Sequence, residues 1–176
     1  DVDPSYGPPG AREARSLRLG TDGSPAILTS TLGAGSVWSI VPADSSGGLG
    51  APIVLDGSTP QSRFADRSAD FDGDGILDLA AVASDELLVW LGAADGGFDP
   101  ATVVATDVPG GDGPFIVDLD GVNGPDIAVV ANLDRIAVYA NDGEGSFTEL
   151  ASTPLPAGTF TNAQLGDFDG DGIIDV

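Results

Sequence analysis

The sequence predicts an all-β protein made of repeated four-stranded units. A nine-residue string, DFDGDGILD at 70–78, returns as DFDGDGIID at 167–175, with a weaker copy, DLDGVNGPD, at 118–126. The copies start 48 and 49 residues apart, and the Gly-rich turns that end in Phe98 and Phe147 are also 49 apart. Between these landmarks lie short apolar segments with the period-two alternation of strands. Four antiparallel strands at this period are typical of a β-propeller blade.

Each repeat has the same expected order of strands. In the middle repeat a strand at 115–119 enters the acidic loop, and further strands follow at 126–131, 135–140 and 147–152. We therefore expect about three complete blades, at approximately 16–58, 64–107 and 113–156, and a partial fourth at 161–176, after a Pro/Gly-rich leader or linker at 1–15. Because an open arc exposes strand edges, the chain is expected to be part of a larger propeller, or to be completed by identical chains.

The first repeat is degenerate. An offset of 52 places Trp38 on Trp90 and Asp22 on Asp74. Its loop, at 18–26, keeps only Asp22 of the acidic set, so we expect no calcium there. The aromatic residues of the repeats are expected in the core rather than in a ligand site; they are Trp38, Trp90, Phe98, Tyr139 and Phe147. The apolar residues expected to pack blade against blade are Leu79, Val82, Leu88, Val89, Ile127, Val130, Ala137 and Val138.

The acidic strings have the ligand chemistry of a hard-cation site. In the first copy, four carboxylates at positions 1, 3, 5 and 9 and the backbone carbonyl at position 7 can converge on one ion; they belong to Asp70, Asp72, Asp74, Asp78 and Ile76. All of these donors are oxygen, and the chain has no His and no Cys, so calcium is favoured over zinc and copper. Magnesium is disfavoured because it keeps several of its waters.

An ordinary turn and an EF-hand loop both fit these strings less well than a repeated calcium loop does. Asp and Gly suit turns, but near-identical copies at repeat spacing are not expected of turns alone. An EF-hand loop begins with the same spacing but needs a bidentate Glu at position 12 and flanking helices. Here position 12 is Ala81 in the first copy and Val129 in the middle copy, and strand-like segments follow.

The composition limits the classes of molecule that the chain can be expected to bind. The formal charge is −22, from 28 acidic and 6 basic groups, so nucleic acid and anionic lipid surfaces should be repelled. Cations, neutral sugars and basic protein patches are the favoured partners, although solubility alone would also explain the charge. No apolar stretch reaches the length of about 18 residues needed to span a bilayer. The chain has no Met, so we expect that a leader was removed or that the chain belongs to a longer protein.

Catalysis is not expected. Without His or Cys the chain can form neither a Ser-His-Asp nor a Cys-His arrangement. A carboxylate pair could cleave a glycosidic bond, but the four glutamates stand in no recognisable motif: Glu13, Glu86, Glu144 and Glu149.

The repeats at 69–98 and 117–147, including the turn NDGEGSF, resemble the FG-GAP or VCBS repeats of integrin-α-like propellers. The resemblance implies blades with calcium between their first and second strands, in proteins that act outside the cell or at its surface in adhesion or in protein or glycan recognition. It implies two calcium sites, the first at the loop described above and the second formed by Asp167, Asp169, Asp171, Ile173 and Asp175. A weaker third site would use Asp118, Asp120, Asn123 and Asp126, because position 5 is Val122. A building block that self-assembles into a ring or filament, and the accessory propeller of a secreted enzyme, remain the alternatives.

Overall fold

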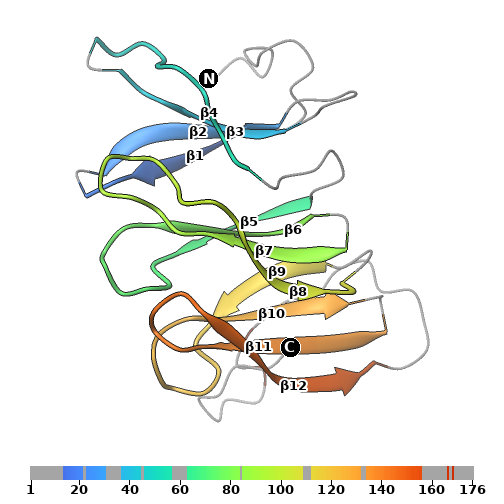
Figure 1. Cartoon of the computed structure of the whole chain (residues 1–176). Helices are drawn as coiled ribbons and strands as arrows, with labels where there is room; N and C mark the ends of the chain where they lie inside the picture. The colour runs from blue at the N-terminus through green and yellow to red at the C-terminus, as the bar shows by residue number, and fades with distance from the viewer. Residues whose placement is uncertain are drawn as a thin grey trace.

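Three four-stranded antiparallel sheets make up the part of the chain that the structure describes, and in each the neighbouring strands are consecutive in the chain (Figure 1). The computed structural model describes residues 14–21, 23–30, 37–44, 46–56, 63–83, 85–108, 112–131, 134–155, 166 and 168. One sheet corresponds to each of the three repeats, so the predicted all-β architecture of propeller blades is confirmed. Most of the predicted leader and of the partial fourth blade lies outside the described residues.

The strand bounds are as follows. The first blade has β1 (Ala14–Leu19), β2 (Ser24–Ser30), β3 (Trp38–Pro42) and β4 (Ile53–Val54). The second has β5 (Arg63–Ala69), β6 (Asp78–Ala83), β7 (Glu86–Trp90) and β8 (Thr102–Thr106). The third has β9 (Asp112–Val117), β10 (Asp126–Ala131), β11 (Arg135–Asn141) and β12 (Phe147–Pro154). Among the described residues there is no helix of the length and apolar character required to cross a membrane.

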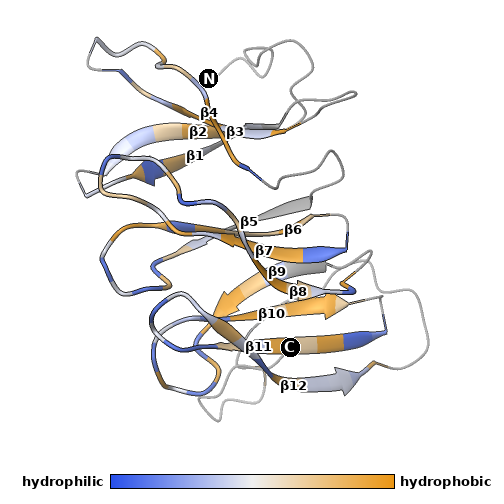
Figure 2. Ribbon diagram, viewed as in Figure 1, coloured by the Kyte–Doolittle hydropathy of each residue, from blue (hydrophilic) through white to orange (hydrophobic). Residues whose placement is uncertain are grey.

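The blades stack face to face, and the core lies between them (Figure 1). All six residues of β6 are buried, because successive side chains point to opposite faces and both faces are covered. Leu79 and Ala81 pack toward the first blade, whereas Ala80 and Val82 pack toward the third. This explains why the inner strands are continuous apolar runs, seen as largely orange ribbon in β10 (Figure 2).

The predicted core residues are buried or packed against the core, but not all of them lie between two described blades. Trp38, Trp90 and Phe98 belong to the contact of the first and second blades, and Tyr139 and Phe147 to that of the second and third. Val130 and Val138 instead lie on the far face of the third blade, around Phe115.

The alignment of Trp38 on Trp90 is wrong. After each third strand a turn is closed by a pair of residues six apart, and these pairs are Ala43 with Leu49, Gly92 with Phe98, and Asn141 with Phe147. From one blade to the next, the third strands are therefore offset by 49 residues. This offset aligns Trp38 of the first blade with Leu87 of the second. The offset of 52 holds only for the first two strands, because Leu28 and its partner Ile40 are twelve residues apart, whereas Ala80 and its partner Val89 are nine apart.

Candidate metal centres

In the second and third blades, an eight-residue loop joins the first strand to the second. Ala69 pairs with Asp78 before the loop at 70–77, and Val117 pairs with Asp126 before the loop at 118–125. Each loop is wound around its own aspartates. Asp70 accepts hydrogen bonds from the backbone N–H groups of Gly73, at 2.8 Å, and Gly75, at 2.9 Å. Both glycines have a left-handed φ, of 76° and 85°, which allows this tight winding.

The next two aspartates continue the winding. Asp72 Oδ1 accepts from the N–H of Asp74 at 3.1 Å, and Asp74 Oδ1 accepts from the N–H of Ile76 at 2.7 Å. Asp74 is exposed, whereas the side chain of Ile76 is buried. The loop therefore holds its shape through hydrogen bonds that, among the described residues, leave the second oxygen of Asp72 and of Asp74 without a bond of this kind.

Asp78 lies beneath the loop as the first residue of β6. Its side chain is fully buried, and its two oxygens accept from the N–H groups of Phe71, at 2.6 Å, and Gly92, at 2.7 Å. It thus joins the start of the loop to the residue that follows the third strand. The pKa of Asp78 is raised to about 6, mainly because of burial and also because of the charges of Asp72 and Asp70, although the two N–H donors act against this shift.

One carboxylate oxygen from each of Asp70, Asp72 and Asp78 lies within 4.8 Å of the other two. Calcium binds oxygen at 2.3–2.6 Å, so two ligands on opposite sides of one ion are separated by roughly 4.8 Å. Within the part of the chain described, none of these carboxylates has an ion pair with an arginine. The donor set, its spacing and its uncompensated charge fit a hard divalent cation such as calcium.

The middle loop repeats this arrangement with the three carboxylates that its sequence retains. Asp118, Asp120 and Asp126 form the second group of carboxylates within 4.8 Å of one another. Asp126 is fully buried at the start of β10, where it accepts from the N–H of Leu119 at 2.8 Å and of Asn141 at 3.0 Å. Asn123, the proposed replacement at position 5, is exposed and has a left-handed φ of 61°.

The third acidic loop cannot be compared in this way. Its predicted ligands lie outside the described residues; they are Asp167, Asp169, Asp171, Ile173 and Asp175.

The corresponding eight residues of the first blade, 18–25, take a different form. Leu17 pairs with Ala26 in the position of Ala69 and Asp78, but pairing then continues through Arg18 with Pro25 and Leu19 with Ser24. The hairpin closes in a turn at 20–23 instead of opening into a wide loop. Arg18 stands where the other blades have Asp70 and Asp118, and Ala26 where they have Asp78 and Asp126.

Asn141 is a site residue that sequence reasoning missed. Its side-chain Nδ2 donates to the carbonyl of Phe71 in the loop of the second blade, at 2.8 Å, and to that of Pro125 at 3.1 Å. Its backbone N–H donates to Asp126 in the third blade. A buried chain of hydrogen bonds therefore connects the two acidic loops. Asn141 begins the turn NDGEGSF, and its sequence context alone indicates only a turn residue.

These features define a β-propeller segment with acidic, cation-compatible loops between first and second strands. The family model described as FG-GAP-like repeat matches residues 118–176, which include the middle and third loops. The search of curated proteins found no match.

The comparison with solved structures gives a lectin that is similar in fold and a toxin that matches less well. A lectin of Agrocybe aegerita, solved for its specific recognition of non-reducing terminal N-acetylglucosamine, shares 21% identity at a TM-score of 0.57. The match covers 81% of this chain and 37% of the lectin. The Tc holotoxin pore of Photorhabdus luminescens shares 18% identity at a TM-score of 0.44, over 98% of this chain and 11% of the toxin chain. The chain thus spans well under half of either structure.

Proposed function

We propose that this chain is a non-catalytic, calcium-stabilised β-propeller module that recognises a protein or glycan ligand outside the cell. The observation that carries the calcium part is the fully buried Asp78, which lies within 4.8 Å of Asp70 and Asp72 without a described basic partner. Three carboxylates brought this close repel one another until a cation neutralises them, so calcium would stabilise the loop and the strands that it joins.

The recognition part is supported by fold and charge. Loops at the ends of a rigid β-scaffold are common sites of binding. The lectin of similar fold recognises a sugar, which motivates a carbohydrate ligand here. A charge of −22 favours neutral or basic partners over nucleic acid. An extracellular or cell-surface location is proposed because calcium sites of modest affinity are typical of extracellular modules.

The absence of catalysis remains part of this proposal. The chain has no His and no Cys. Of the described glutamates, Glu149 forms an exposed ion pair with Arg135 at 3.6 Å, and Glu144 lies in an exposed turn. Neither belongs to the two acidic groups.

Thermal unfolding in calcium and in excess EDTA tests the metal part. At a hundredfold excess over its dissociation constant, one bound calcium adds about 2.7 kcal/mol to the free energy of unfolding. A melting temperature that is the same in both buffers would refute the calcium proposal. Glycan and protein arrays probed with the calcium-loaded chain test recognition, and sedimentation of the same sample tests the alternative of self-assembly.

A further inference from the structure

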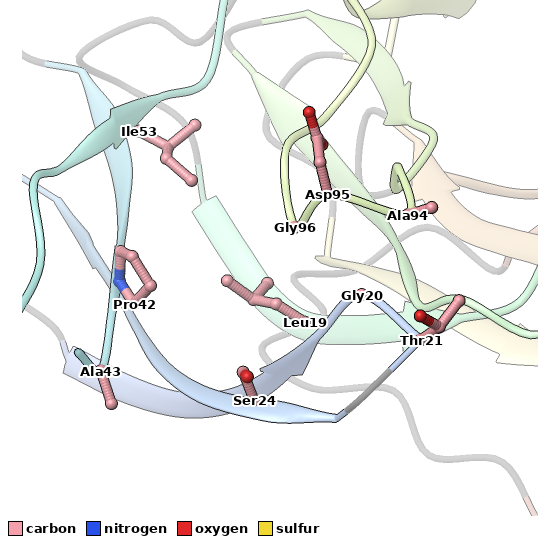
Figure 3. Close-up of a pocket in the computed structure, with 10 residues that line it drawn as sticks. All are labelled: Leu19, Gly20, Thr21, Ser24, Pro42, Ala43, Ile53, Ala94, Asp95 and Gly96. Carbon is pink, nitrogen blue, oxygen red and sulfur yellow. The ribbon is translucent and has the colours of Figure 1, made fainter. Parts of the chain in front are cut away.

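A pocket of about 260 Å³ lies where the first blade meets the second (Figure 3). The first blade contributes the tip of its first hairpin and part of its third and fourth strands, and the second blade contributes the turn after β7. The lining residues are Leu19, Gly20, Thr21, Ser24, Pro42, Ala43, Ile53, Ala94, Asp95 and Gly96. None of them belongs to the acidic groups.

The pocket lies beside the hairpin that replaces an acidic loop. In the next junction, between the second and third blades, the loop residue Phe71 is 1% exposed and packs edge-to-face on Phe147, with ring centroids 5.3 Å apart. Asn141 bridges the same junction through the carbonyl of Phe71. In the first junction the corresponding residues are Leu19 and Gly92, so the bridge made by Asn141 has no counterpart there. The pocket is bordered by the narrow hairpin and by Leu19, whose side chain is smaller than that of Phe71.

The walls of the pocket are of two kinds. Leu19, Pro42 and Ile53 form an apolar side, Ser24 contributes a hydroxyl group, and the exposed side chains of Thr21 and Asp95 lie at the rim (Figure 3). The turn that carries Asp95 is held in place, because its Oδ1 accepts from the N–H of Gly97 at 2.9 Å. Gly20 keeps the two blades close here, since a Cβ at this position would lie 3.2 Å from the carbonyl oxygen of Ala94.

We propose that this pocket binds a single neutral sugar ring of the ligand. The inference rests on the proposed recognition function and gives it a place and a chemistry. The Asp95 carboxylate accepts hydrogen bonds from sugar hydroxyls, and charge-assisted bonds of this kind are the strong ones. The C–H face of the ring covers the apolar side. An anionic ligand is disfavoured by Asp95 and by the charge of −22. The volume suits a single ring rather than a larger ligand.

The probes are methyl glycosides of neutral hexoses and N-acetylhexosamines, tested one at a time by saturation-transfer NMR with calcium present. We expect at least one to bind with a dissociation constant on the order of 1 mM. Asp95→Asn should weaken that binding at least tenfold, and Ala94→Trp, a change at an exposed residue of the lining, should abolish it. The matched control is Glu144→Gln, because Glu144 holds the position of Asp95 in the third blade and is exposed. Melting curves verify that each variant is folded.

Each outcome decides the question. Binding that is lost in Asp95→Asn and Ala94→Trp but kept in Glu144→Gln supports the pocket. If no glycoside binds, or if n-butylammonium binds the pocket in preference to every glycoside, the sugar assignment is overturned. If the intact chain binds a glycan array and Ala94→Trp binds equally, the pocket is overturned while the proposed recognition function stands.

Discussion

Replacement of Asp72 by Asn should stabilise the protein in the absence of calcium and should remove most of the stabilisation that calcium gives. Asp72 shares the first acidic group with Asp70 and Asp78, with the three oxygens within 4.8 Å of one another. Asn removes the charge but keeps an oxygen that can accept from the N–H of Asp74, as Asp72 Oδ1 does at 3.1 Å. The loop should therefore keep its conformation while its electrostatics change.

The magnitude follows from the spacing of the carboxylates. Two unit charges at this separation repel by roughly 0.9 kcal/mol at the permittivity of water and by roughly 3.5 kcal/mol at an effective permittivity of 20. Because Asp72 is only partly buried, the lower figure applies. The substitution removes two of the three repulsive pairs, so the metal-free variant should be more stable than the parent by about 2 kcal/mol.

Calcium should abolish this difference in stability. The parent gains about 2.7 kcal/mol at a hundredfold excess of calcium over its dissociation constant. If the loss of one carboxylate ligand weakens binding a hundredfold, the gain of the variant at the same calcium concentration falls to about 0.4 kcal/mol. The stability advantage that the variant has in EDTA should therefore disappear in calcium.

Urea unfolding in EDTA and in calcium, followed by the fluorescence of Trp38 and Trp90, measures both effects. The control is Asp99→Asn, which removes an exposed charge outside both acidic groups. The reasoning is refuted if Asp72→Asn is less stable than the parent in EDTA, or if calcium stabilises variant and parent by the same amount.

Three further predictions concern the buried groups around this site. In EDTA the protein should lose about 2 kcal/mol of stability as the pH rises from 4 to 6, because the folded pKa of Asp78, about 6, exceeds its ordinary value of 3.8 and protonation therefore favours the folded state below that window. Urea unfolding across this pH range measures the slope, and stability that rises with pH in EDTA would contradict the buried, uncompensated carboxylate. Asn141→Leu should cost about 2 kcal/mol in urea unfolding, since the buried carbonyl of Phe71 loses its donor, and a neutral effect would contradict the bridge. Phe71→Leu should cost about 1–2 kcal/mol through the lost contact with Phe147, whereas the same stability as the parent would show that the junction repacks without loss.

The architecture could be predicted well because the repeat is marked by short-range sequence features, namely the acidic strings, the Gly-rich turns and the alternating apolar segments. The strands expected at 126–131 and 135–140 correspond to β10 (Asp126–Ala131) and β11 (Arg135–Asn141). The connection between the second and third strands is three residues longer in the first blade than in the second. A single offset fitted to the first two strands does not reveal this insertion, and it therefore misaligned Trp38.

The acidic site was predicted in part. The sequence identified the aspartates that come together in two loops, although the predicted ligand Asp74 does not belong to the first group. The weaker calcium binding expected of the middle loop stays a prediction. The sequence carried no sign that Asp78 and Asp126 also join the third strand to the loop, since the partners Gly92 and Asn141 are 14 and 15 residues away. Such contacts depend on how strands pair, which short motifs do not encode.

The equal length of the three segments 18–25, 70–77 and 118–125 has a consequence for how such a repeat can diversify. Each segment begins and ends at an equivalent strand pair, so exchanging one for another requires no change of chain length elsewhere. Eight residues, together with the strand-initial position that follows, then decide whether a junction carries a cation-compatible acidic group or a narrow hairpin beside a pocket. Blades with the same backbone can in this way acquire different chemistry at equivalent positions.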